Sequence, residues 1–76
     1  MKDLIEQFEK DLRVYIENAF NSSSEKDEIK KFDETEEKVS DYVDYYLLKS
    51  SLMPKDVALP TQHILDEFAR AKGFIK

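Results

Sequence analysis

Apolar residues recur every three or four positions along most of this chain, which is the spacing that builds one face of an α-helix. Between Asp3 and Phe20 they fall within one arc of a helical wheel, whereas Val14 lies outside that arc and is expected to be exposed. Asp3, followed by Glu6, resembles a capping box at the start of this helix. No stretch alternates as a β-strand does, so the sequence predicts an all-α fold. The apolar face consists of Leu4, Ile5, Phe8, Leu12, Tyr15, Ile16 and Ala19.

Two breaks in this pattern divide the 76 residues into three helices, which we expect to form one domain over residues 1–76. The helices are predicted at about residues 3–20, 25–52 and 61–72. The middle helix is long compared with the average of about 11–12 residues in globular proteins. Gly73 is expected to close the third helix in the left-handed conformation, with Phe74 and Ile75 folding back as a hydrophobic contact. The predicted fold class is therefore a small three-helix domain with a long central helix.

Serine and proline residues mark the two breaks. Ser24 is the expected N-cap of the middle helix, because a serine side chain accepts a hydrogen bond from the free N–H groups of a first turn. Pro54 is expected to end the middle helix, because the residue before a proline avoids the helical conformation. The third helix then begins either with Thr61 as its cap, or with Leu59 as its cap and Pro60 in its first position.

The middle helix changes towards its end, where it becomes apolar on two sides. One side continues a heptad-like seam of alternating three- and four-residue spacings. The other side, formed by Tyr45, Leu48 and Leu52 with Tyr42 at its edge, points almost the opposite way. Such a helix must be covered on both sides, either by another helix of the chain or by a partner. Tyrosine is common at interfaces, so these four residues are a candidate partner interface. The seam consists of Ile29, Phe32, Glu36, Val39, Val43, Tyr46 or Leu47, and Ser50.

The small size of the chain favours self-association. Domains below about 70–80 residues rarely bury enough apolar surface to be stable alone, and usually depend on disulfides, a metal or oligomerisation. The sequence has no Cys and one His, which excludes disulfides and the usual zinc sites. A homodimer is therefore expected.

The chain is acidic, with 17 acidic residues against 12 basic ones and a formal net charge of −5. Nucleic-acid-binding domains usually carry a basic face, and docking on anionic lipid also requires basic residues. We therefore expect a protein partner, with no membrane partner, and a weak DNA-binding accessory role is only a third hypothesis. No stretch resembles a signal peptide or a membrane span, so the expected location is the cytoplasm.

Four carboxylates form a row along the middle helix. Asp33, Glu37, Asp41 and Asp44 lie within one narrow arc of its surface. Carboxylates spaced along a rigid rod can imitate a nucleic-acid backbone and occupy a basic channel of another protein. Alternatively, the row is a solvated helix face, interrupted by lysines such as Lys38. A small acidic inhibitor that occupies a basic, nucleic-acid-binding surface of a partner protein is therefore the second hypothesis for function.

The sequence contains no constellation suited to catalysis or cofactor binding. The single histidine, His63, is expected near the start of the third helix, and the serines at positions 22–24 are better explained as helix caps than as nucleophiles. One glycine cannot build a phosphate-binding loop. Carboxylates on one straight helix face do not converge as metal ligands must. We therefore expect no enzyme activity, no cofactor and no metal, and the leading hypothesis is a protein–protein interaction module that forms homodimers.

Overall fold

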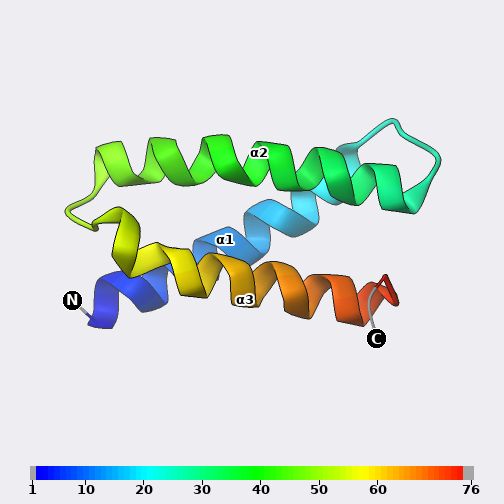
Figure 1. The fold of residues 1–76 in the computed structure, drawn as a ribbon. Helices are drawn as coiled ribbons and strands as arrows, with labels where there is room; N and C mark the ends of the chain where they lie inside the picture. Colours follow the sequence, from blue (N-terminus) through cyan, green and yellow to red (C-terminus); the bar gives the residue numbers. More distant parts are fainter. Residues whose placement is uncertain (1, 75–76) are drawn as a thin grey trace.

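The structure, a computed structural model, describes residues 2–74 of the chain. These residues fold into three helices, α1 (Lys2–Ser22), α2 (Glu28–Lys49) and α3 (Pro54–Lys72), with no strand among them, which confirms the all-α, three-helix fold (Figure 1). α2 runs in the opposite direction to α1 and α3 (Figure 1). The radius of gyration of 12.5 Å and the extents of 38 × 24 × 17 Å are those of a short helical bundle.

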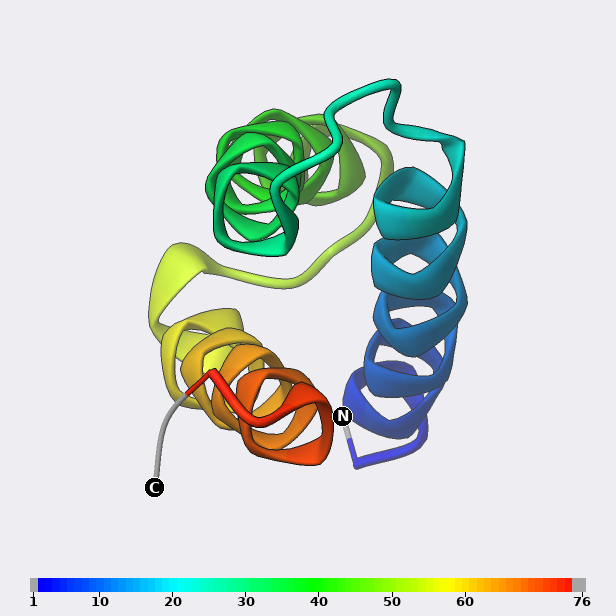
Figure 2. The same ribbon diagram turned by 90° about the vertical axis from the view of Figure 1, so that its right-hand side faces the viewer.

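α1 is the helix that holds the fold together, because it packs along both other helices, which contact each other much less. Figure 2 shows α2 and α3 almost end-on in one layer, with α1 crossing on the other side. Phe8, Leu12 and Ile16 follow one another at four-residue spacing on α1 and are at most 1% exposed. A long central α2 is therefore not confirmed: α2 has 22 residues against 21 in α1, and α1 is the helix that contacts both neighbours.

Phenylalanine side chains join the three helices at the end of the bundle where α1 stops and α2 starts. Phe20 of α1 meets Phe68 of α3 edge-to-face, with the ring centroids 5.2 Å apart. Phe32 of α2 stacks on the same Phe68 ring, with the centroids 6.1 Å apart. Aromatic pairs of this kind add about 0.5–1.5 kcal/mol beyond the area that they bury. The three rings therefore fasten this end of the bundle.

α2 begins at Glu28 instead of at about residue 25, and its N-cap is Asp27 instead of Ser24. The Asp27 carboxylate accepts hydrogen bonds from the backbone N–H of Ile29 at 2.9 Å and of Lys30 at 3.4 Å. Aspartate and serine are about equally good caps. Local preference therefore could not decide between the two positions.

α3 begins at Pro54, so most of the predicted connection over residues 53–60 is helical. Pro54 occupies the first helical position, where its missing N–H has no intrahelical partner to lose. The Asp56 carboxylate accepts a hydrogen bond from the Met53 backbone N–H at 3.0 Å, and the Met53 carbonyl accepts one from the Asp56 N–H at 2.9 Å. The proline that was expected to stop α2 therefore starts α3, and α2 ends at Lys49.

Pro60 lies inside α3, so neither Thr61 nor Leu59 caps this helix. An interior proline removes one helical hydrogen bond and is unfavourable by about 3 kcal/mol in an isolated helix. The buried Val57 and Ile64 side chains, on either side of Pro60 in sequence, pack into the core with α1. Tertiary packing therefore outweighs the local preference for a break.

The C-terminal end of α3 has the predicted geometry. Gly73 adopts a φ of 82°, in the left-handed region where a side chain would be strained. The Gly73 N–H donates to the Arg70 carbonyl at 3.1 Å and the Phe74 N–H donates to the Ala69 carbonyl at 2.8 Å, which together form a Schellman motif. Phe74 folds back near Phe20, whereas the predicted contact of residue 75 lies outside the described residues.

Replacement of Phe8 by Ala is expected to lower the free energy of unfolding by about 3–5 kcal/mol, because it leaves a cavity in the only stripe that faces both other helices. That loss approaches the whole stability of a domain of this size. Urea denaturation followed by circular dichroism measures it. Val14→Ala is the control, since Val14 is 56% exposed on the same helix and should change stability by less than about 0.5 kcal/mol. Equal losses in the two variants would contradict the assignment of Phe8 to the core.

Candidate functional site

The end of α2 that was predicted to be apolar on two sides is covered on one side only. Tyr42 is half-buried and stacks on Tyr15 of α1, with the ring centroids 4.1 Å apart. Tyr45 and Leu48 remain 58% and 85% exposed. The Tyr45 ring is partly screened by Lys49, whose ammonium nitrogen lies 5.5 Å from the ring centroid. Neither α1 nor α3 therefore covers the outer side of α2 at Tyr45 and Leu48.

Leu52 does not belong to that exposed surface, which corrects its place in the predicted interface. It is 4% exposed and packs in the hydrophobic core with Val57 and Leu65 of α3. The prediction extended α2 by three residues too many, whereas the helix ends at Lys49 and the chain turns there. The Leu52 backbone N–H donates to the Ser50 hydroxyl oxygen at 3.3 Å within this turn. A helical wheel gives the wrong direction for a side chain beyond the end of its helix.

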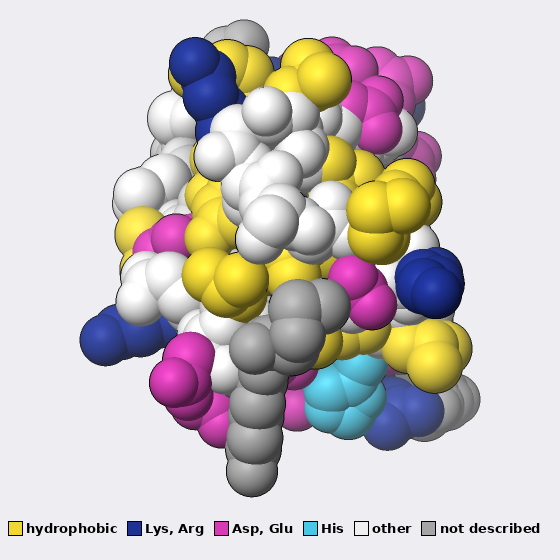
Figure 3. Space-filling model, turned by 90° about the vertical axis from the view of Figure 1, so that its left-hand side faces the viewer, with side chains coloured by type: hydrophobic (Ala, Val, Ile, Leu, Met, Phe, Trp, Pro, Cys, Tyr) yellow, Lys and Arg dark blue, Asp and Glu magenta, His cyan; other side chains and the backbone are white. Residues whose placement is uncertain are grey.

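Further exposed apolar side chains lie in the segments that meet at this end of the bundle. Figure 3 views this end, where α1 and α3 start and α2 stops, and hydrophobic side chains are spread over it between polar ones. Five of the seven large apolar residues that are exposed among residues 2–74 belong to these segments, and we call this set the apolar end. The apolar end consists of Leu4, Tyr45, Leu48, Met53 and Leu59.

The carboxylate row of α2 is fully presented to solvent. Asp33, Glu37, Asp41 and Asp44 are all exposed, as the sequence predicted. Within residues 2–74 none of the four takes part in an ion pair, whereas Glu67 of α3 pairs with Arg13 at 3.3 Å. The negative charge of the row is therefore not neutralised by the chain's own basic side chains.

A groove of about 360 Å³ lies between α2 and α3, and none of the residues described as lining it comes from α1. It therefore opens on the side of the α2–α3 layer that faces away from α1. Sequence reasoning missed this groove, because one of its walls is the first two turns of α3, which were predicted to be a loop. The capping position of Asp56, two residues after Pro54, was the signal that could have found them. The groove is lined by Glu36, Val39, Ser40, Val43, Asp44, Leu47, Pro54, Val57, Ala58, Thr61, Gln62 and Leu65.

Three ionisable groups among residues 2–74 have shifted pKa values: Glu36, which lines the groove, and Tyr42 and Tyr46, which pack between α1 and α2. Partial burial raises the pKa of Glu36, and the neighbouring Asp33 and Asp66 carboxylates raise it further. Burial also raises the pKa of the Tyr46 phenol, and so does its hydrogen bond to the Asp11 carboxylate at 3.1 Å. These shifts follow from packing and from like charges. None of them places a general acid beside a nucleophile.

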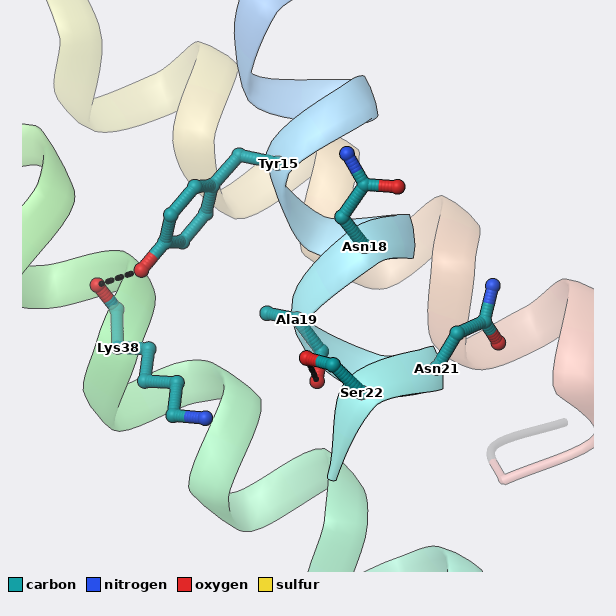
Figure 4. A pocket seen from close by; sticks show the side chains of 6 residues that line it. All are labelled: Tyr15, Asn18, Ala19, Asn21, Ser22 and Lys38. Atoms are coloured by element: carbon teal, nitrogen blue, oxygen red, sulfur yellow. Dashed lines mark hydrogen bonds between the residues drawn. The ribbon is translucent and has the colours of Figure 1, made fainter. Parts of the chain in front are cut away.

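A second hollow, of about 720 Å³, lies beside the C-terminal end of α1 (Figure 4). The Tyr15 hydroxyl donates to the Lys38 carbonyl across its floor at 3.3 Å, which ties α1 to α2. Asn18 and Asn21 point away from Tyr15 in Figure 4 instead of converging with it. This hollow is therefore an open surface between two helices that lacks the convergent polar groups of a ligand site.

His63 contacts a carboxylate on the surface of α3. Its Nε2 atom lies 2.9 Å from Glu67 Oε1, one turn further along α3, and both side chains are at least half exposed. Among residues 2–74, no three His, Asp or Glu side chains are close enough to hold a metal ion. In the same range, no helix is long and apolar enough to cross a membrane.

No known protein family matches this chain, and no similar curated protein or solved structure was found. Its function therefore has to be inferred from its own surfaces.

Replacement of Glu36 by Gln is expected to stabilise the fold slightly at pH 7, by less than about 1 kcal/mol because the carboxylate is largely solvated. The pKa of the Glu36 carboxyl is raised in the folded protein, which therefore disfavours the charged form. The fold then loses stability as the pH rises above 4.5, the ordinary pKa of this group. Glu36→Gln should therefore flatten the fall in melting temperature between about pH 4.5 and pH 7.

The control is Glu37→Gln, which removes the same charge from the neighbouring position on the solvated row. Its melting temperature should follow that of the unmodified chain more closely across this pH range. A steeper fall in the Glu36→Gln variant would contradict the assigned cause.

Proposed function

We propose that this protein is a non-enzymatic protein-interaction module whose first partner is a second copy of itself. The observation that carries this proposal is the exposure of Tyr45 and Leu48 at the end of α2, within a broader apolar end. Burial of a leucine side chain contributes about 1.5–3 kcal/mol, and tyrosine is among the residues that contribute most at interfaces. Burial of the Tyr45 and Leu48 side chains against a partner is therefore more favourable than their exposure to water.

The size of the chain supports the same proposal. A chain of 76 residues buries only about 60% of the surface that its unfolded form exposes, so its core alone leaves little margin of stability. Association of folded chains adds stability that grows with the logarithm of their concentration. A second copy of the chain is a partner that is always present, and at the same concentration as the chain itself.

A two-fold pairing of the α2 ends suits the charges near them. In such a dimer the same surface of each copy meets itself, so two α2 helices cross about the Tyr45–Leu48 turn. An antiparallel crossing brings Lys49 of each copy towards Asp44 of the other. That contact would offset part of the repulsion between two chains that each carry a net charge of −5.

Combined replacement of Tyr45 and Leu48 by Glu is expected to convert a dimer into a monomer with the helical content unchanged. Both side chains are exposed in the single chain, so the fold does not depend on them. Sedimentation velocity over a dilution series and far-ultraviolet circular dichroism measure the two quantities. The control is Val14→Glu, because Val14 is also an exposed apolar residue but lies outside the apolar end. An unmodified chain that is a folded monomer at every concentration would sink the proposal.

A second candidate function is the occupation of a basic surface on another protein by the carboxylate row. The observation that favours it is that Asp33, Glu37, Asp41 and Asp44 are exposed and, within residues 2–74, form no ion pair. They extend over 12 residues of α2, or about 16 Å at 1.5 Å per residue. A rigid row of this length can follow several positive charges on a partner.

Charge reversal of Asp33, Glu37 and Asp41 to Lys is expected to abolish binding to such a partner, while the melting temperature stays nearly unchanged because these side chains are solvated. Capture of the same basic protein on immobilised unmodified and variant chains measures the loss. The matched control reverses Glu6, Glu9 and Glu17 on α1, which changes the net charge equally. The same loss in both variants would show that only net charge matters.

A further inference from the structure

The groove between α2 and α3 has an apolar floor that the fold leaves open. Val39, Val43 and Leu47 line it from α2 at four-residue spacing, and Val57 and Leu65 line it from α3. Its floor is therefore continuous with the hydrophobic core, to which these five residues belong or against which they pack. Hydrophobic side chains inserted from outside would meet apolar atoms on both walls.

The charges along this groove are of one sign. Glu36 and Asp44 are the only charged residues among those described as lining it. Asp33 of α2 and Asp66 of α3 lie near enough to Glu36 to raise its pKa, so the Glu36 end of the groove has more than one carboxylate beside it. A ligand that places positive charge at both positions would remove this repulsion.

A buried polar atom without a partner belongs to one of the residues that line the groove. The Thr61 hydroxyl oxygen is buried and makes no hydrogen bond among the described residues, although a helical threonine can donate to the carbonyl four residues before it. A buried hydroxyl without a partner is unfavourable by about 1–3 kcal/mol. The Thr61 side chain would have to turn into the groove before this hydroxyl could bond to an occupant.

We infer that this groove binds a basic amphipathic helix of a partner protein, whose apolar stripe enters between α2 and α3 and whose Lys or Arg side chains reach Glu36 and Asp44. The α2 wall runs from Glu36 to Leu47, which is about 16 Å at 1.5 Å per residue and so matches three helical turns. Glu36 and Asp44 are eight residues apart, or about 12 Å along the axis. A partner helix that lies alongside α2 can reach both the Glu36 and the Asp44 carboxylates if its basic residues are two turns apart.

A second copy of the chain does not suit this groove. Each copy has 17 acidic residues against 12 basic ones, and the exposed end of α2 would bring Asp41 and Asp44 against Glu36. Like charges brought together disfavour a complex. Tyr45 and Leu48 do not line the groove, and Asp44 borders both surfaces, so the inference does not depend on self-association.

The probe is a fluorescein-labelled Leu/Lys peptide of about 14 residues, or four helical turns, with leucines on one helical face and lysines on the other. Fluorescence anisotropy is expected to show binding that weakens as salt is added. A peptide of the same composition in shuffled order should bind at least about tenfold more weakly, because it cannot place a stripe in the groove. Equal binding of the two peptides, or no binding at low salt, would overturn the inference.

Variants locate the binding on the protein. Ala58→Trp fills the groove without changing charge and should weaken binding by at least about tenfold. Ala71→Trp is the matched control, because Ala71 is also an exposed alanine of α3 but lines a separate hollow between α1 and α3, beside Arg13 and Glu67. Equal effects of the two tryptophans would overturn the inference.

Charge and oligomeric state are tested separately. The combined replacements Glu36→Lys and Asp44→Lys should abolish binding of the peptide. The control combines Glu6→Lys and Glu17→Lys, which change the net charge equally and should leave the affinity for the peptide within about twofold. The Tyr45→Glu, Leu48→Glu variant should bind the peptide at least as tightly as the unmodified chain does, because Asp44 then has no Lys49 of a second copy beside it, so failure of self-association and failure of the groove are distinguishable. Amide chemical-shift changes confined to the groove support the inference, and changes confined to α1 or to Tyr45 and Leu48 contradict it.

Discussion

Burial of the apolar stripe of α1 against both other helices is the interaction on which the rest of this structure depends. Most of the stability of a helix in a protein comes from the packing of its apolar face and not from its local helix preference. Phe8, Leu12 and Ile16 supply that packing for α2 and α3 together, because α1 crosses the layer that the two form (Figure 2). The chain therefore uses its first helix as the common support of the other two.

This arrangement decides which surfaces stay open. Because α2 and α3 are both held by α1, they need little contact with each other, and a groove with an apolar floor remains between them. The outer side of α2 at Tyr45 and Leu48 faces away from α1 and has no cover from α3. The open side of α2 thus carries the carboxylate row and, at its end, Tyr45 and Leu48, whereas the groove lies between α2 and α3.

Much of the fold could be predicted from the sequence, because helical spacing is a local property. The three helices, the apolar face of α1 and the closure of α3 at Gly73 follow from residues close together in the chain. The start of α3 could not be predicted in the same way. Pro54 and Pro60 are read locally as breaks, yet the first begins α3 and the second lies within it, because Val57 and Ile64 are buried against α1.

The candidate surfaces also divide into features that the local sequence predicts and features that only the tertiary structure decides. The sequence by itself determined that Asp33, Glu37, Asp41 and Asp44 form a row along one side of a helix and that this row leads to Leu48 and Tyr45, since both follow from 100° per residue. Only the tertiary structure decided that Leu52 is buried, that Tyr42 stacks on Tyr15, and that a groove separates α2 from α3. The physical reason is that the cover of a side chain depends on where the chain turns and on which helix crosses it, and these contacts join residues far apart in the sequence.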